Sequence, residues 1–502
     1  MEINLNLKKI KFQDKIALLL FTLIFSPILF LLVKSFYQDT ESLKYLFKNL
    51  LFDYSINTIY LVIITSFFSL ILGIIPAWYV SNHQFPGRRI IDLILYLPLS
   101  IPTYIMAFTY SELLSYTGPF KITYDFLQIE ILGILLAFSL YPYIYSVSRI
   151  SFSLFGSKYY DLAKNLGLSG YQTLIKVVLP LSKPAIFSGL FLVIMEVLNE
   201  YGAVKYFGVN TYTIGIFRSW NSMNDSGAAI QLSSILLFIV AFLFFLEKYF
   251  NQNKRFSFSK NSKLVSLIRP DNSTKFLIYL ICLIPIVLAF VIPVLFNLIN
   301  IFSSFDDINF ERLLNLTFNS FTISLISSVL ILVVSTFFLY NEKISNSKIY
   351  YYINQFISLG YSIPGAVVAL AVIISVTGLD NLNDNIKLLG SFSVYFLILI
   401  YAYIIRFMAV GKSPIKSSLE KHPESYDNSA KNLGLSNFKI FQKIYFPINK
   451  YAFFTALILV FIDLMKELPI TLILRPFNFD TLATQTYEFA IEEMIPLSSI
   501  YS

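Results

Sequence analysis

The feature that most constrains this chain is a seven-residue phrase that occurs twice. Ala-Lys-Asn-Leu-Gly-Leu-Ser occupies residues 163–169 and again residues 430–436, an offset of 267 positions. The same offset relates Pro180 to Pro447. Both copies lie between long apolar stretches. The sequence therefore predicts a membrane protein built from two related halves, each of which presents the same polar element.

The apolar stretches predict an all-α protein with many membrane spans. Hydrophobic residues make up 56% of the 502 residues, and a helix of about 20 such residues crosses about 30 Å of hydrocarbon. Backbone groups inside a bilayer must be paired within the chain, which favours helices. Eleven stretches qualify as spans: residues 16–33, 56–80, 90–110, 129–148, 184–200, 228–246, 276–298, 317–340, 353–376, 391–410 and 451–465. The last is short, and we expect it to extend toward Lys466.

Charge placement predicts the orientation in the membrane. With the N-terminus in the cytoplasm, most of the 38 Lys and Arg residues fall in cytoplasmic segments, as the positive-inside rule requires. Both copies of the phrase are then cytoplasmic. The net charge of +8 is thus explained by orientation in the lipid bilayer, and no compact basic domain is present to bind nucleic acid.

The chain divides near its middle into two parallel repeats. Residues 1–246 form the first predicted transmembrane half, residues 247–275 a polar, basic cytoplasmic linker, and residues 276–502 the second half. The first half has six predicted spans and the second five. We therefore expect twelve spans by symmetry, with the last one lost because the sequence is truncated, frame-shifted or naturally short.

A second repeated segment supports the duplication. Ser-Ile-Pro at 100–102 recurs at 362–364, an offset of 262. Each copy lies inside a predicted span, where proline removes a backbone hydrogen bond and bends the helix.

The repeated phrase belongs to two cytoplasmic loops, 149–183 and 406–450, with a common pattern. In each, an Ala is followed four residues later by Gly, and a Pro lies thirteen residues after that Gly. The pattern resembles the "EAA" loop of ABC-importer permeases. The residues that carry the resemblance are Asp161, Ala163, Gly167 and Pro180 in the first loop, and Ala430, Gly434 and Pro447 in the second. The second loop departs from the pattern at Asn428, where an acidic residue is expected, although Asp427 precedes it.

The resemblance implies a fold, partners and a location. The fold would be two type I importer (MetI-like) transmembrane halves in a bacterial inner membrane. Each loop would form a coupling helix docked on one of two cytoplasmic ATP-binding subunits. A periplasmic substrate-binding protein would deliver the solute, with residues 201–227 and 466–490 as its docking surfaces.

The sequence argues against an enzyme. His83 and His422 are the only histidines, so no catalytic or metal-binding cluster can be assembled convincingly. Gly411-Lys412-Ser413 lacks the first glycine of a phosphate-binding loop, since Arg406 stands at that position. We expect no cofactor in this chain, and ATP hydrolysis on a separate subunit.

The segments after the fifth and eleventh spans indicate which substrate class the protein transports. Residues 195–220 and 463–484, with Leu-Tyr-Pro-Tyr at 140–143, resemble the fused permeases of ferric-iron importers. Thiamine and phosphonate importers have related permeases, so thiamine and phosphonate remain alternative substrates. A secondary transporter driven by an ion gradient is a further alternative, but it leaves the two matched loops unexplained.

Four acidic residues near the ends of these spans are candidates for the translocation path. The offset of 267 relates Glu196 to Asp463 and Glu200 to Glu467. Carboxylates at such positions often line a polar route, and oxygen ligands suit a hard cation such as ferric iron. The competing interpretation is a simple interfacial ion pair that involves Lys466.

Overall fold

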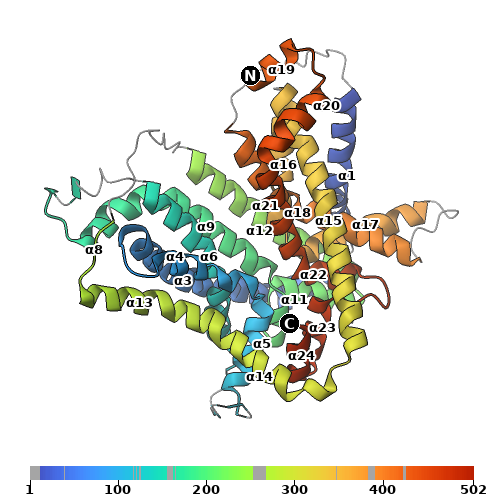
Figure 1. Ribbon diagram of the computed structural model, residues 1–502. Coiled ribbons are helices and arrows are strands. Elements are labelled where there is room, and N and C mark those ends of the chain that lie inside the picture. The colour runs from blue at the N-terminus through green and yellow to red at the C-terminus, as the bar shows by residue number, and fades with distance from the viewer. Residues whose placement is uncertain are drawn as a thin grey trace. The chain divides into compact units, whose positions relative to one another are not determined.

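The computed structural model describes residues 12–38, 40–116, 118–119, 121, 123, 126–154, 162–163, 165–252, 267–345, 348–382, 391–421 and 425–502. Within these ranges the chain is helical apart from turns, short irregular connections and one isolated bridge between His83 and Ile268 (Figure 1). Nine of the described helices are long and apolar enough to cross a membrane, or up to eleven crossings if each of two bent pairs counts as one. The all-α multispan fold is therefore confirmed.

The chain forms two compact units. Unit 1 comprises Met1–Asp39 and Leu314–Thr481, and unit 2 comprises Thr40–Leu313 and Leu482–Ser502.

The helices of unit 2, in chain order, are α2 (Thr40–Asn49), α3 (Leu51–Asn82), α4 (Arg88–Ile94), η1 (Leu97–Ser100), α5 (Thr103–Leu114), α6 (Ile129–Leu154), α8 (Gly170–Thr173), η2 (Leu174–Val178), α9 (Leu179–Asn199), α10 (Gly202–Tyr206), α11 (Tyr212–Phe217), η3 (Arg218–Ser222), α12 (Ser226–Gln252), α13 (Asn272–Ile286), η4 (Val287–Val291), α14 (Ile292–Ser303), η5 (Phe305–Asp307), α23 (Leu482–Ile491) and α24 (Ile495–Tyr501).

Those of unit 1 are α1 (Phe12–Ser35), α15 (Phe310–Ser345), which enters the unit at Leu314, α16 (Lys348–Ile357), η6 (Gly360–Ser362), α17 (Gly365–Leu382), α18 (Phe392–Leu419), α19 (Ser425–Asn432), α20 (Asn437–Ile440), η7 (Phe441–Tyr445), α21 (Phe446–Met465) and α22 (Pro469–Leu474).

These units divide the chain differently from the sequence repeat, because the first span of each half, and also helices α23 and α24 at the end of the second half, lie in the unit formed mainly by the other half. Helix α1 belongs to the first half but packs on α17 and α18 of the second. Helices α13 and α14 open the second half but pack on α3, α4 and α5 of the first (Figure 1). Unit 1 is therefore completed by one helix of the first half, and unit 2 by several helices of the second half.

Both Ser-Ile-Pro segments interrupt their spans more strongly than a simple kink. In unit 2 the helical segments on either side of the break, Arg88–Ser100 and Thr103–Leu114, meet at 89°. In unit 1 the corresponding segments Ile349–Ser362 and Gly365–Asp380 meet at 111°. A short 3₁₀ turn, η1 or η6, precedes each break. The predicted proline bends are confirmed, and both are full changes of direction.

The outer faces of the long helices carry the apolar side chains expected next to lipid. On α3 the exposed residues Ile59, Ile63 and Phe67 recur every four positions and form one stripe. Between helices in lipid there is little hydrophobic driving force, so close packing and polar contacts must hold the bundle together.

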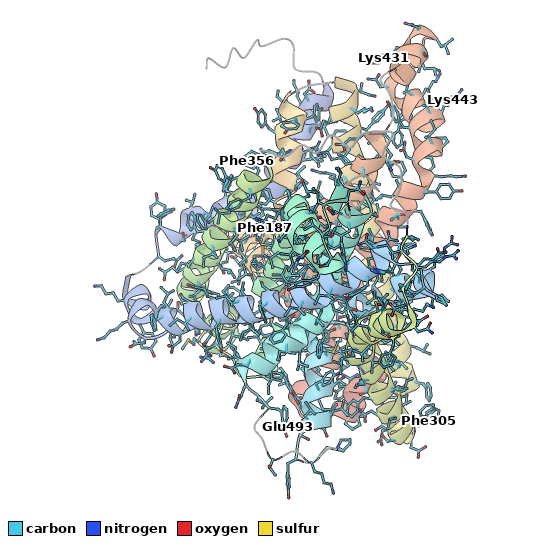
Figure 2. All side chains as sticks on the ribbon, turned by 90° about the vertical axis from the view of Figure 1, so that its left-hand side faces the viewer. Phe187, Phe305, Phe356, Lys431, Lys443 and Glu493 are labelled. Carbon is cyan, nitrogen blue, oxygen red and sulfur yellow. The ribbon has the colours of Figure 1, made fainter. Side chains whose placement is uncertain are left out.

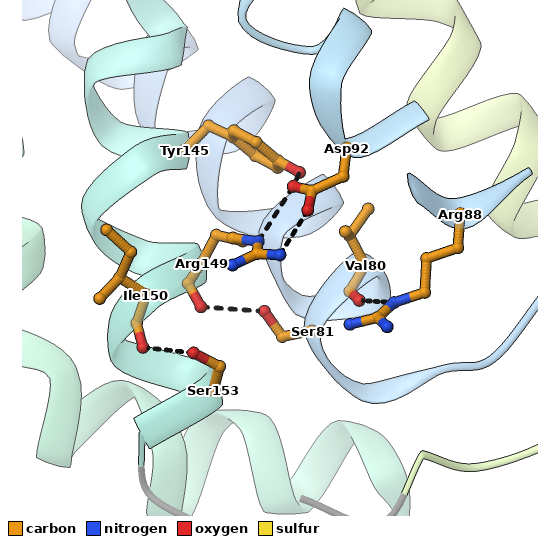
Figure 3. A network of polar contacts seen from close by, with 8 residues as sticks. All are labelled: Val80, Ser81, Arg88, Asp92, Tyr145, Arg149, Ile150 and Ser153. Carbon is orange, nitrogen blue, oxygen red and sulfur yellow. Dashed lines mark hydrogen bonds and ion pairs between the residues drawn. The ribbon is translucent and has the colours of Figure 1, made fainter. Parts of the chain in front are cut away.

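One such polar contact braces α4 to α6 in unit 2. Tyr145 donates a hydrogen bond from its hydroxyl to Asp92 at 2.7 Å, and Arg149 Nε donates to the same carboxylate at 2.9 Å (Figure 3). A second Arg149 nitrogen pairs with the other carboxylate oxygen, so the guanidinium binds Asp92 in a bidentate manner. This contact ties the broken span to its neighbour.

Unit 1 places a different brace at the matching positions. The offset of 262 relates Asp92 to Asn354, and the offset of 267 relates Tyr145 to Lys412. Lys412 donates from Nζ to the carbonyl of Asn354 and, at 2.7 Å, to the hydroxyl of Ser358. The two halves thus keep the location of the brace and change its chemistry.

The expected extension of the span at 451–465 is wrong in direction. Helix α21 ends at Met465, and it is continuous on its other side with η7 and α20, back to Asn437. The chain turns after Met465 because the Glu467 carboxylate accepts a hydrogen bond from the N–H of Ile470 at 3.2 Å, inside the next helix α22. The additional span length therefore comes from the loop side.

Candidate functional site: two matched loops

In the first loop the repeated phrase ends a helical turn at a left-handed glycine. The N–H of Leu166 donates to the carbonyl of Leu162, and the N–H of Leu168 donates to that of Ala163, both at 3.0 Å. Gly167 between them has φ of +74°, a conformation that costs other L-residues about 1–2 kcal/mol. The predicted contact residue Asp161 lies outside the described residues.

The second loop repeats this geometry. The N–H of Leu433 donates to Ser429 and that of Leu435 to Ala430, both at 3.2 Å, and Gly434 has φ of +75°. A glycine in this position is a common helix terminator, because the reversed backbone satisfies carbonyls at the helix end. The glycine of the phrase is therefore explained by local geometry in both loops.

The serine that closes each phrase starts the next helix. Ser169 accepts a hydrogen bond from the N–H of Gln172, whose side chain in turn accepts from the N–H of Ser169, so the pair forms a capping box at α8. Ser436 accepts from the N–H of Lys439 at the start of α20. In each loop a left-handed turn is thus followed by a capped helix.

A wide turn then joins each capped helix to its membrane span. The N–H of Leu179 donates to the carbonyl of Leu174, five residues back, and Phe446 donates to Phe441 in the same way. Pro180 and Pro447 follow immediately. Proline has no N–H to donate and its ring crowds the carbonyl four residues earlier, so a π-type turn is one way to accommodate it. The predicted prolines therefore shape the junction between loop and span.

Burial divides each phrase into an inner and an outer side. Ala163 and Ala430 are both 2% exposed, whereas Leu166 and Leu433 are 77% and 79% exposed. Small buried alanines let the turn lie close to its own unit. The leucine of each turn therefore points outward and is exposed.

The second loop rests on a defined core. The members of this cluster are Leu339, Ile415, Leu419, Ala430, Ile440, Tyr445, Phe453 and Ala456. Tyr340 donates from its hydroxyl to the carbonyl of Asn437 at 2.5 Å, and Lys343 donates to that of Leu419 at 2.8 Å. Lys431 and Lys443 lie at the outer end of this part of unit 1 (Figure 2). The described part of the second loop is therefore packed on the core of unit 1.

The four candidate path carboxylates have different surroundings. Glu196 is half-buried. Asp463 forms an ion pair with Lys466 at 2.9 Å, as the competing interpretation expects. Glu200 accepts hydrogen bonds from the hydroxyl of Thr103 and, at 2.9 Å, from the N–H of Ala203.

Glu467 makes the most unusual contact of the four, with a residue that the sequence reasoning treated only as part of the cytoplasmic loop. Its Oε1 lies 3.5 Å from Nη1 of Arg406, and the two side chains are 6% and 3% exposed. A buried ion pair of this kind needs both partners, since either charge alone is costly to bury.

The first half has no such pair at the matching positions. The offset of 267 relates Ser139 to Arg406, and the offset of 262 relates Thr103 to Gly365. A Cβ atom on Gly365 would contact Arg406 and lie 2.9 Å from Glu467. The missing side chain thus leaves room for the guanidinium. The ion pair of Arg406 and Glu467 could have been found from the sequence by comparing the two halves at these offsets, because Arg406 and Gly365 have no counterpart of the same type in the first half.

Fold and site together define a class: a multispan, all-α membrane protein with duplicated halves, in which each half presents the same left-handed turn with an exposed leucine. Residues 69–256 and 343–498 match the family described as binding-protein-dependent transport system inner membrane component. These two segments cover more than half of the chain, and each contains one loop. The chain belongs to this family and is a permease component of a membrane transport system.

Individual relatives give a finer comparison. The chain is 24% identical over 469 residues to Fe(3+)-transport system permease protein FbpB 2 of Haemophilus influenzae, covering 92% of this chain and 89% of that protein. It is 30% identical over 156 residues to sulfate transport system permease protein CysT of Escherichia coli, covering 29% of this chain and 55% of that protein. A probable sulfate permease of Chlorokybus atmophyticus is 26% identical over 207 residues, 38% of this chain and 72% of its own length.

Proposed function

We propose that this chain is the membrane permease of an ATP-driven importer and that its two loops each dock on one ATP-binding subunit in the cytoplasm. The observation that carries the proposal is the matched geometry of the loops: the same left-handed glycine, the same capped helix and the same outward leucine in both. In this proposal the N-terminus is cytoplasmic and a binding protein docks on the opposite face, with Asp161 adding to the first ATPase contact.

Movement would be a rigid-body switch. Closure of the two ATP-binding subunits would push both loops, and each loop is continuous through a π-type turn with a long span, α9 or α21. A two-state change of this kind is biased by ligands that bind the states with different affinity. The permease would supply no catalytic group to ATP hydrolysis.

We propose ferric iron as the cargo. The support is the similarity to the Fe(3+)-transport permease, which extends over 92% of this chain. Glu196 and Glu200 are the proposed oxygen ligands along the route, together with Asp463 and Glu467, whose charges are shared with Lys466 and Arg406.

Sulfate is the second candidate, because the sulfate permeases match at higher identity over a shorter segment. An oxyanion would favour cationic ligands such as Arg406, whereas a ferric ion would favour the carboxylates.

The test is ATP hydrolysis by the assembled transporter, reconstituted in nanodiscs with its ATP-binding subunits. We expect ferric-loaded binding protein to stimulate hydrolysis and sulfate-loaded binding protein to have no effect. Stimulation by sulfate, thiamine or phosphonate binding proteins alone would retain the importer and reject the iron assignment. Failure to bind any ATPase subunit, with folding confirmed, would favour a gradient-driven transporter.

A further inference from the structure

A groove of about 840 Å³ lies in unit 2 between the end of α5, α14 and the start of α24, three helices that pack on one another (Figure 1). Helix α14 is the last part of the candidate span Asn272–Ser303, so the groove lies on a membrane-spanning element. The residues on α14 that line it recur every three or four positions and therefore share one face of the helix. The apolar lining as a whole consists of Leu113, Leu114, Ile292, Leu295, Phe296, Ile299 and Pro496.

Hydrogen bonds between helices hold the walls of this groove together. Asn297 donates from Nδ2 to the hydroxyl of Thr109 on α5 at 3.1 Å. Asn300 donates to the hydroxyl of Ser499 on α24 at 3.2 Å. The hydroxyl of Tyr110 donates to a backbone carbonyl of η4 at 2.5 Å. Both α5 and α24 are thus fixed to the same span, and the groove between them is a built feature of unit 2.

One part of the groove is polar, because the turn after α5 folds back on that helix. The N–H of Gly118 donates to the carbonyl of Ser115 at 3.1 Å, and the N–H of Lys121 donates to the carbonyl of Gly118 at 3.2 Å. A Cβ atom on Gly118 would clash with the carbonyl oxygen of Glu112, so glycine is needed for this close approach. The turn therefore brings Lys121 to the end of α5 that carries Glu112.

The charges in the lining are balanced. Among the described residues that line the groove, only Glu112 and Lys121 are charged, and the first is half-buried while the second is exposed. One anion and one cation beside an apolar wall are complementary to a zwitterionic lipid. Lysines near a bilayer surface attract lipid phosphate, and a carboxylate accepts charge-assisted hydrogen bonds from a primary ammonium. The quaternary ammonium of phosphatidylcholine has no N–H to donate.

We propose that the groove binds one molecule of phosphatidylethanolamine, with its phosphate on Lys121, its ammonium on Glu112 and an acyl chain along α14. A bilayer lipid reaches the groove from the side, because Leu295 and Ile299 are 53% and 65% exposed. Lipid tails are as apolar as the wall, so the wall adds little preference for one lipid over another. The headgroup contacts distinguish the bound lipid from the surrounding bilayer.

Native mass spectrometry of the full chain tests this site. The delipidated protein in detergent would be titrated with phosphatidylethanolamine, phosphatidylcholine or phosphatidylglycerol that carry the same acyl chains. We expect one tightly bound ethanolamine lipid per chain, with the choline and glycerol lipids about tenfold weaker. Glu112→Gln should remove the preference for ethanolamine over choline. Lys121→Gln should weaken the binding of both lipids about tenfold, because both carry the phosphate.

Tryptophan substitutions test the apolar wall. Leu295→Trp and Ile299→Trp each place a larger side chain in the groove, and both should abolish the tight binding event. The neighbouring Leu298 is 44% exposed but does not line the groove, so Leu298→Trp is the matched control and should leave binding unchanged. Gel filtration of each variant checks that it is folded, and either wall variant alone is sufficient for the test.

Equal binding of the three lipids, unchanged by the groove variants, would show ordinary annular lipid and overturn the proposal. A preference for phosphatidylglycerol that Lys121→Gln removes would also overturn it, in favour of an anionic lipid. The measurement needs neither the ATP-binding subunits nor a cargo, so its outcome is independent of the proposed function.

Discussion

Arg406 is a buried guanidinium that needs both a counter-charge and space. Glu467 supplies the charge, and the absent side chain of Gly365 supplies the space. The first half holds Thr103, Ser139 and Glu200 at the corresponding positions. There Thr103 donates to Glu200, and the buried hydroxyl of Ser139 has no partner among the described residues. We therefore expect the residue types at positions 365 and 406 to be energetically coupled.

This coupling gives a prediction at the residue scale. Arg406→Ser alone should destabilise the protein by about 3–5 kcal/mol, because Glu467 is left buried without its cation. Adding Gly365→Thr should recover about 1 kcal/mol or more, since it rebuilds the first-half arrangement and coupling between contacting sites has this size. Thermal unfolding in detergent would measure both.

The control for that cycle is the more exposed pair of Arg475 and Asp480, whose side chains are 24% and 29% exposed. Arg475→Gln should cost less than about 1 kcal/mol, as partly solvated pairs do. Strict additivity of the Gly365 and Arg406 substitutions would contradict the coupling.

At the scale of elements, three π-type turns precede a proline by one residue. They are η2 before Pro180, η7 before Pro447 and η4 before Pro293. The first two lie between a loop and its span. The widened turn sets the rotation of the loop about the helix axis, because each residue of an α-helix contributes about 100° of rotation.

Pro180→Ala should therefore restore a regular α-helix, since alanine has the N–H that proline lacks and a high helix propensity. We expect unchanged or higher thermal stability but at least a tenfold loss of stimulated ATP hydrolysis, because the loop is turned away from its partner. Pro293→Ala, outside the loops, is the matched control and should keep full stimulation. Full stimulation in Pro180→Ala would show that the turn is not needed for coupling.

Sequence reasoning predicted where these elements lie in the chain but could not predict their backbone geometry. The offset of 267 placed both loops, and Gly167 and Gly434 both have the left-handed backbone that glycine favours. The π-type turns could not be foreseen, because proline also permits a plain kink or a new helix start. The ion pair of Arg406 was missed because the positive-inside rule already explains an arginine near the cytoplasmic end of a predicted span.

At the scale of the whole molecule, the nine described spans and two bent pairs agree with the eleven predicted stretches. The exchange of first spans between halves was beyond sequence reasoning. Helix α1 is apolar on all sides, so its pattern does not indicate which neighbour it contacts.

The proposed orientation makes a prediction for thiol labelling. Cys282 is the only cysteine and is fully buried, so the natural chain should give little background. Leu166→Cys and Leu433→Cys should react with a membrane-impermeant maleimide only after the membrane is opened. Phe305→Cys and Glu492→Cys should react in intact spheroplasts. The reverse pattern would invert the topology and remove the proposed ATPase contacts.

The most direct test of the account is the coupling of both loops to ATP hydrolysis. Gly167→Asn and Gly434→Asn place a side chain in open space on the outer face of each turn, and asparagine tolerates the left-handed backbone. Gly87 has φ of +73° and equal open space outside the loops, so Gly87→Asn is the control. In the assembled transporter with loaded binding protein, we expect each loop variant to reduce stimulated hydrolysis at least tenfold and the control to retain it. Full stimulation in both loop variants would contradict the assignment of the loops as the ATPase contacts.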